Sequence, residues 1–271
     1  MKKIIFSLMI FSLSLNLYAL TKNEKLFLNS ARFGDIETVK ELINSEIDID
    51  IQDQEGFTAL MYAAAKGNLE MVKLLIKEGA YADLKDNNGV TAMGYALTPE
   101  VLEFFINEVG YYTIDEEILI QQVSYILKKE NIKVLLDAGV NVNYKDPIYG
   151  NTALILAGAR DQYDIIKLLI EHGADVNLQS NYKSTVLMSA MDAKTTKIIL
   201  EAGAKVNLQD QDGNTALTYH LIYNWQYDII KMLLEHGADV NIRNKEGKSA
   251  VDIAEKMNEP EIYDLIKKYQ N

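Results

Sequence analysis

Apolar and polar residues alternate along the chain in short helical patterns that are separated by turn-forming residues. Thr58 precedes an apolar, alanine-rich run at residues 59–65, and Gly67 follows this run. A threonine hydroxyl caps the first turn of a helix, whereas glycine permits the left-handed residue that ends one. Residues 69–78 (LEMVKLLIKE) then place apolar side chains three and four positions apart, as on one face of a helix. The pattern predicts a helix, a tight turn and a second helix that ends at Gly79.

This pattern is repeated along the chain. Residues 165–179 (IIKLLIEHGADVNLQ) and 229–243 (IIKMLLEHGADVNIR) are identical at eleven of fifteen positions. The glycines that follow the second helices recur at intervals of 29 to 34 residues, at Gly79, Gly110, Gly139, Gly173, Gly203 and Gly237. Such a period indicates one supersecondary unit that is stacked on copies of itself. Because a single helix pair exposes too much apolar surface to be stable, we expect neighbouring copies to bury that surface.

The repeats resemble those of the ankyrin family, which have a period of about 33 residues and the signature T-P-L-H-x-A. The chain matches through TAL at residues 58–60, 152–154 and 215–217, and through GADVN at 173–177 and 237–241. The family's Pro is Ala in these TAL segments, and its His is replaced by other residues. The resemblance extends over roughly residues 25–269. It implies an all-α solenoid of helix–turn–helix units with short hairpin connectors.

The repeats divide the chain into residues 1–19 and an array over residues 20–271. The repeat at 116–145 lacks the TAL signature, the one at 180–209 is shortened near Asp192, and the one at 210–243 has an extra residue near Trp225. We expect eight repeats, at about 25–52, 53–85, 86–115, 116–145, 146–179, 180–209, 210–243 and 244–271. The first and last have the charged outer faces of capping repeats.

The N-terminus predicts export. Lys2 and Lys3 precede an uncharged apolar stretch, and Ala19 provides a small residue for cleavage, which is the form of a secretory signal peptide. An uncleaved membrane anchor is the alternative, although the apolar run is short for a spanning helix. The chain has no Cys, which excludes a lipid-anchored lipoprotein and any disulfide. We expect a periplasmic or secreted protein that is free of the membrane after cleavage.

The net charge is −12, and loss of residues 1–19 leaves 25 basic and 39 acidic residues, a net charge of −14. This balance argues against nucleic acid as a ligand, since binding to phosphates depends on basic side chains. It also disfavours anionic lipid. A basic or neutral protein partner fits better, and solubility of the array is the alternative explanation of the charge.

The sequence contains no recognisable catalytic constellation, cofactor motif or set of metal ligands, so we expect no enzyme, cofactor or metal. His172 and His236 precede the glycines of equivalent repeats, where a histidine interacts favourably with the helix dipole. His220 replaces a small Ala of a first helix and is the His that most needs a structural explanation. If the chain were an enzyme, His220 and Asp212 would be the residues to substitute.

The resemblance implies that the hairpin tips and the ends of the first helices bind a partner. Residues there that differ between repeats are the candidate contacts: Phe57, Lys66, Val90, Tyr149, Asn151, Arg160, Tyr182, Asp212, Asn214 and Tyr223. Phe57, Tyr149 and Tyr182 are favoured because aromatic residues anchor interfaces. The alternative is that these are solvated turn residues. Tyr111, Tyr112 and Trp225 either pack internally or mark an exposed patch.

We therefore expect a monomeric, exported scaffold that binds a protein. In a narrower version the partner is an envelope or secreted enzyme or toxin that the array inhibits, protects or activates. A self-associating structural protein is the alternative from a different class.

Overall fold

The structure, a computed structural model, describes residues 20–109 and 116–270. Within these ranges the chain consists of helices, turns and loops, with no β-strand. The chain divides into two compact units, residues 1–114 and 115–271, which we call the N-terminal unit and the C-terminal unit. The predicted signal peptide at residues 1–19 lies outside the described residues, as do Tyr111 and Tyr112.

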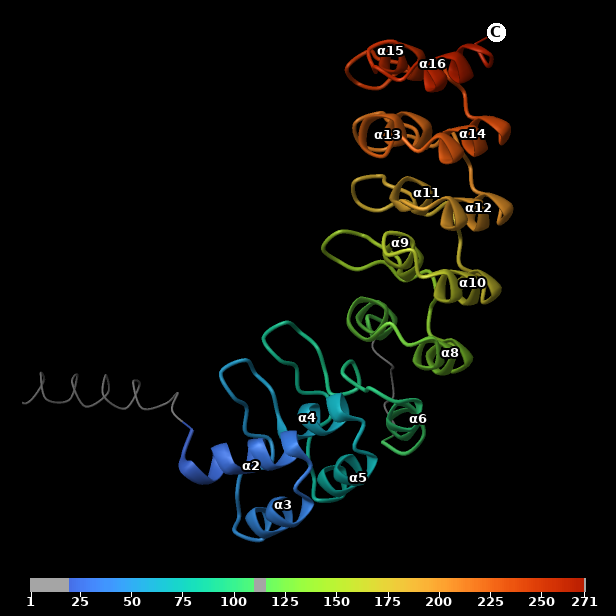
Figure 1. The fold of residues 1–271 in the computed structure, drawn as a ribbon. Helices are drawn as coiled ribbons and strands as arrows, with labels where there is room; N and C mark the ends of the chain where they lie inside the picture. Colours follow the sequence, from blue (N-terminus) through green and yellow to red (C-terminus); the bar gives the residue numbers. More distant parts are fainter. Residues whose placement is uncertain (1–19, 110–115, 271) are drawn as a thin grey trace, which may run out of the picture. The chain divides into compact units, whose positions relative to one another are not determined.

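The N-terminal unit contains helices α2 (Lys22–Phe33), α3 (Ile36–Ile43), α4 (Ala59–Lys66), α5 (Leu69–Lys77) and α6 (Pro99–Asn107) (Figure 1). Each first helix contacts its own second helix, and α2 also packs on α4. The predicted caps are confirmed. The Thr58 hydroxyl accepts a hydrogen bond from the amide of Met61 at 3.2 Å, and Gly67 ends α4 with a φ of 68°.

One first helix of the N-terminal unit is reduced to turns. Residues 92–95 form consecutive turns, although they follow the TA signature of their repeat. Gly94 disfavours a helix in the middle of this segment, and Pro99 starts α6 only a few residues later. The chain therefore has room for two short turns, and the amide of Leu97 donates to the carbonyl of Ala64 in the preceding repeat at 3.1 Å.

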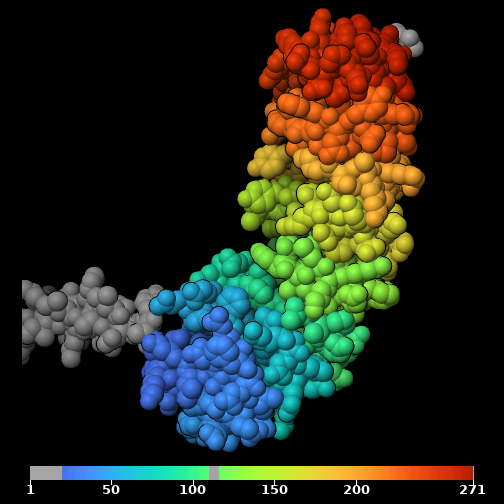
Figure 2. Space-filling view, in the orientation of Figure 1, coloured from blue at the N-terminus to red at the C-terminus, as the bar shows by residue number. Residues whose placement is uncertain are grey.

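The C-terminal unit begins with an irregular helix pair and continues as a regular stack. Its helices are α7 (Ile118–Gln121), the π-helix η1 (Gln122–Ile126), α8 (Lys129–Asp137), α9 (Ala153–Gly158), α10 (Tyr163–Glu171), α11 (Val186–Ser189), α12 (Ala193–Glu201), α13 (Ala216–Tyr223), α14 (Tyr227–Glu235), α15 (Ala250–Ala254) and α16 (Pro260–Lys267). The first helices α9, α11, α13 and α15 lie in one column, and α10, α12, α14 and α16 lie in a second (Figure 1). Figure 2 shows the successive layers of this unit in contact along the stack.

Small side chains allow the first helices to approach one another closely. Ala63, Ala157, Ala190 and Ala254 occupy equivalent positions and are fully buried. The second helices contribute larger apolar side chains, such as Leu75, Leu169 and Leu233, which are also fully buried. No helix among the described residues is long and apolar enough to cross a membrane.

Candidate functional site

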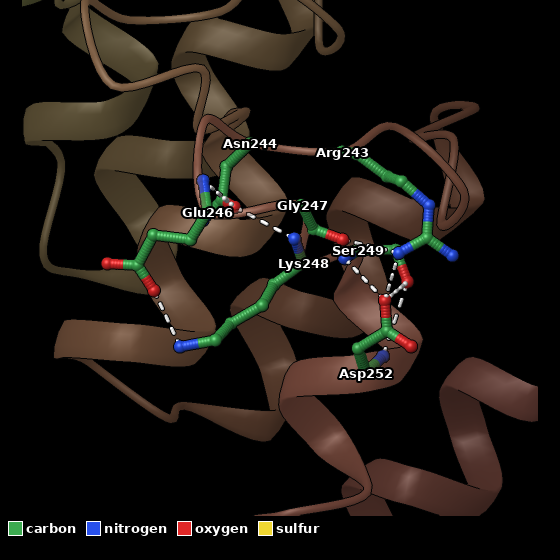
Figure 3. Close-up of polar contacts among 7 residues, drawn as sticks. All are labelled: Arg243, Asn244, Glu246, Gly247, Lys248, Ser249 and Asp252. Atoms are coloured by element: carbon green, nitrogen blue, oxygen red, sulfur yellow. Dashed lines mark hydrogen bonds and ion pairs between the residues drawn. The ribbon is translucent and has the colours of Figure 1, made fainter.

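The hairpin tips are closed by backbone hydrogen bonds between their ends and are held rigidly by their own side chains. They comprise residues 53–57, 86–90, 146–151, 180–184, 210–214 and 244–248. Each tip starts with an acceptor side chain, usually Asp, that binds backbone amides further along the turn. The Asp210 carboxylate accepts from the amides of Asp212 and Asn214, both at 2.8 Å. In the last tip, the Asn244 side-chain oxygen accepts from the amides of Glu246 and Lys248, both at 3.0 Å (Figure 3). Each tip is thus ordered without a partner.

Hydrogen bonds also join each tip to the next. The Gln209 side-chain amide donates to the carbonyl of Gly213 in its own tip at 2.6 Å and to that of Arg243 in the next at 3.2 Å. Gln179 makes the equivalent pair of bonds one repeat earlier. Gly150 is required where two tips approach, because a Cβ there would lie 2.3 Å from the Asn181 side-chain oxygen. The tips of the C-terminal unit therefore form one connected surface.

The structure brings two of the predicted aromatic residues together on this surface. Tyr149 and Tyr182 lie on successive tips, and their rings stack with centroids 6.5 Å apart and an interplanar angle of 29°. The two residues are 52% and 50% exposed, and the neighbouring Ile148 is 74% exposed. This cluster, Ile148, Tyr149 and Tyr182, is the aromatic tip patch.

Phe57, in the N-terminal unit, is placed differently. It is half-buried, and its ring packs against Tyr62 and Tyr95 at centroid distances of 5.1 and 4.8 Å. The hydroxyl of Tyr62 donates to Asp53 at 2.5 Å. Burial raises the pKa of Tyr62 to about 12, and the hydrogen bond to Asp53 adds to the shift. Phe57 therefore packs between its own repeat and the next, and its contact with a partner stays a prediction.

Two of the predicted contact residues are not on the surface. Val90 is only 2% exposed and Asn214 only 7% exposed. Asn214 precedes the N-cap of α13, and Val90 has the equivalent place before the turns at residues 92–95. In both residues the backbone amide bonds back to the aspartate that starts the tip. The Asn214 side-chain oxygen accepts from the Asn244 amide at 3.0 Å. The burial of Val90 contradicts the expectation that it contacts a partner, whereas Asn214 still lines a pocket between its tip and the next, so its contact with a partner stays a prediction.

The remaining predicted residues lie at or near the surface. Lys66, Arg160 and Tyr223 are exposed at the ends of α4, α9 and α13, and Tyr223 is 65% exposed. Asp212 is exposed on a tip, whereas Asn151 is half-buried and its amide donates to Asp146. Of these five residues, Lys66 belongs to the N-terminal unit, as Phe57 does, and the other four belong to the C-terminal unit.

The asparagine of the GADVN segment is a structural residue that we did not recognise from the sequence. The Asn207 side-chain oxygen accepts from the amide of Asp239 at 2.9 Å, and its amide donates to the carbonyl of Gly237 at 3.1 Å. Asn143 and Asn177 bridge to their following repeats in the same way. The recurrence of this Asn in successive repeats of the C-terminal unit, as Asn143, Asn177, Asn207 and Asn241, was the available signal. It indicates that the residue serves the stack and not a partner.

The histidines have structural partners. The side chains of His172 and His236 bond through Nδ1 to the carbonyls of Leu168 and Met232, at 2.8 and 2.7 Å, in the last turn of their helices. These positions confirm the predicted placement of both histidines at helix ends. Among the described residues, no group of three or more His, Asp or Glu side chains is arranged to hold a metal ion.

His220 supplies a hydrogen bond that the shortened repeat before it lacks. Because α11 ends early, the carbonyls of Leu187 and Met191 receive no backbone hydrogen bond. His220 Nε2 donates to the Leu187 carbonyl at 3.1 Å, and Nδ1 accepts from the Asn224 amide at 3.3 Å. Asn224 and Gln226 both donate to the Met191 carbonyl. Burial lowers the pKa of His220, which is fully buried in its neutral form.

A family model described as "Ankyrin repeats (3 copies)" matches residues 27–115, 119–210 and 187–271. The chain belongs to the ankyrin repeat family. Curated relatives with similar segments include "Ankyrin repeat and SOCS box protein 6" of Mus musculus, 50% identical over 44 residues, and of Homo sapiens, 52% identical over 44 residues. Each alignment covers 16% of this chain and 10% of the relative. The ankyrin match therefore extends along nearly all of the described array, whereas the similarity to these relatives is local.

Proposed function

We propose that this ankyrin-repeat chain is a non-enzymatic scaffold that binds another protein on its hairpin tips and on the ends of its first helices. The observation that supports this most strongly is the aromatic tip patch. Tyr149 and Tyr182 each leave about half of their surface in solvent, and Ile148 leaves more. Large, half-exposed rings contribute little to the core, and rings of this kind are frequent anchors of protein interfaces.

The rigidity of the tips supports the same function. The Asp146 carboxylate accepts from the amides of Ile148 and Tyr149, at 3.0 and 2.6 Å, and the amide of Asn181 donates to the Tyr149 carbonyl at 2.8 Å. Residues that are ordered before binding lose less conformational entropy when they bind. The patch is therefore suited to bind a folded partner without rearrangement.

The charge of the array supports a basic or neutral partner. Residues 20–109 contain 8 basic and 16 acidic residues, and the full chain carries a net charge of −12. A negative potential speeds the approach of a positively charged protein and slows that of nucleic acid or an anionic membrane. In the narrower form of the proposal the array has eight repeats, is exported as a monomer, and acts on an envelope or secreted enzyme or toxin as an inhibitor or accessory factor.

Affinity capture with residues 20–271 tests the proposal. The bait is compared with a variant that carries Tyr149→Ala and Tyr182→Ala, and with a control that carries Tyr81→Ala and Tyr269→Ala, two exposed tyrosines outside the tips. The expected result is a protein from an envelope extract that the wild type and the control retain and that the tip variant loses. Equal retention by all three baits would show that the aromatic tip patch is not the interface. Light scattering of the free bait distinguishes a monomeric scaffold from a self-associating protein.

A further inference from the structure

Trp225 occupies a backbone position with positive φ that three other repeats give to Gly or Asp and one gives to Leu127. It lies immediately before the N-cap residue of a second helix, as do Gly34, Gly67 and Asp161. At all four positions φ is positive, with values of 82°, 68°, 50° and 51° for Gly34, Gly67, Asp161 and Trp225. Left-handed backbone favours glycine, and asparagine or aspartate tolerate it better than a bulky aromatic residue does. Trp225 is therefore a costly choice at this position.

Burial does not explain this choice. Trp225 is 56% exposed, and its indole N–H makes one hydrogen bond, to the Ile222 carbonyl at 3.3 Å. Tyr223, two residues earlier, is 65% exposed and contacts the Tyr219 ring at a centroid distance of 4.7 Å. A strained backbone position that also exposes a large apolar side chain is a reason to look for a binding role.

Trp225 and Tyr223 line a groove of about 480 Å³. The groove lies between α13 with its hairpin tip and α15 with its own tip. The opposite wall includes Ile253 and Met257, which are half-buried. Residues of both tips also line it. This is a volume that accommodates side chains of a bound ligand, with apolar walls to receive them.

The charges around the groove differ from those of the rest of the chain. Three lysines, Lys245, Lys248 and Lys256, and two acids, Asp212 and Glu246, line it. The Lys248 ammonium pairs with Glu246 at 2.5 Å (Figure 3). Among the described residues, Lys245 and Lys256 have no such ion-pair partner, so a carboxylate ligand would find two free ammonium groups. The surrounding array is acidic and repels a ligand with many negative charges.

From these observations we infer that the groove between α13 and α15 binds an extended peptide segment of the partner protein in which an apolar side chain is followed closely by one carboxylate. The apolar side chain lies between Trp225 and Met257, and the carboxylate binds Lys245 and Lys256. The inference rests on the proposed scaffold function and assigns this groove its ligand chemistry. A basic partner remains compatible with it, since the segment itself carries little charge.

A random dodecapeptide library displayed on phage, selected against residues 20–271, provides the probe. An enriched peptide is synthesised with a fluorescein label, and its affinity is measured by fluorescence anisotropy. Trp225 is the only Trp in the chain, so a change in its intrinsic emission reports whether the peptide lies in the groove. The variants are Trp225→Ala and the double variant Lys245→Glu with Lys256→Glu. Lys167→Glu, on the exposed face of α10, is the control with a charge change of the same kind.

The expected peptides contain an apolar residue next to Asp or Glu and change the Trp225 emission. We expect both groove variants to weaken their binding at least about tenfold, and the control to change it by less than about twofold. Circular dichroism must show the same helix content in all variants. Absence of enriched peptides, enrichment of Lys- or Arg-rich peptides, or binding that both groove variants retain would overturn the inference. If the groove variants still capture the partner protein and only the aromatic tip variant loses it, the scaffold function stands and the groove inference alone fails.

Discussion

Protonation of His220 is expected to destabilise the protein in mildly acidic solution. The imidazole of His220, which belongs to α13, is fully buried. It donates to the carbonyl of Leu187 in α11 and accepts from the Asn224 side-chain amide. Both ring nitrogens are therefore used in the neutral form. A second proton would face the Asn224 amide, which is itself a donor. These two hydrogen bonds thus favour the neutral ring, in agreement with the burial that lowers the pKa of His220.

The sign and size of the effect follow from this shift. Because the pKa of His220 is lower in the folded chain than its usual value of 6.5, the unfolded chain binds the proton more strongly. Above about pH 6.5 both states are neutral and the group contributes no pH dependence. Below that pH the free energy of unfolding falls by up to about 1.4 kcal/mol per pH unit, until the pH reaches the folded pKa.

Urea unfolding of residues 20–271, followed by circular dichroism between pH 7.5 and 5.0, measures this dependence. The control is His220→Gln, whose side-chain amide can donate to Leu187 and does not titrate. His220→Ala is expected to lower the free energy of unfolding by about 2–4 kcal/mol at pH 7.5, because it leaves a buried carbonyl unpaired and opens a cavity. If the wild type and His220→Gln lose stability equally as the pH falls, the reasoning about His220 is wrong.

Four further substitutions test the stack and the position of Trp225. Asn207→Ala removes both bonds to the next repeat and should lower the free energy of unfolding by about 1 kcal/mol, measured by urea unfolding. Gly150→Ala should cost at least about 2 kcal/mol in the same assay, whereas Gly173→Ala, with positive φ but open space around it, should cost about 1 kcal/mol; equal losses would contradict the tight approach at Gly150. Trp225→Gly removes the strain of an aromatic residue with positive φ, so the thermal unfolding midpoint of this variant should equal or exceed that of the wild type. A clear fall would show that Trp225 stabilises the core.

The local features of the fold could be predicted from the sequence. The caps at Thr58 and Gly67 depend only on neighbouring residues, and the structure confirms both. The second helix predicted at residues 69–78 corresponds to α5, Leu69–Lys77. Such features are specified within one repeat, so repetition of the pattern makes them easy to recognise. The all-helical fold followed from them.

Contacts between repeats were harder to predict. Val90 and Asn214 vary between repeats, and we took this variation as a sign of exposure. The structure shows that both side chains are buried, and that Asn214 bonds to Asn244 of the neighbouring tip. His220 illustrates the same point, because the carbonyl of its partner Leu187 becomes available only where α11 is short. Such relations depend on the three-dimensional stack and not on the sequence of a single repeat.

The role of the tyrosines at the tips could be predicted in part. The sequence placed Tyr149 and Tyr182 at equivalent tips and identified them as possible anchors. The structure adds that their rings stack on one another and are half exposed. Whether Trp225 packs internally or lies exposed could not be decided from the sequence, because its positive φ and the groove beside it are properties of the folded chain.

Photo-crosslinking tests most directly whether the tip face binds a partner. A benzoylphenylalanine photoprobe is introduced in place of Tyr182, on the aromatic tip patch, or in place of Lys167, on the exposed face of α10. Each bait is irradiated with the extract from which the wild type captures its partner. The account predicts one covalent adduct from position 182 and none from position 167. An adduct from position 167 alone, or none from either position, would contradict the claim that the hairpin tips form the binding face.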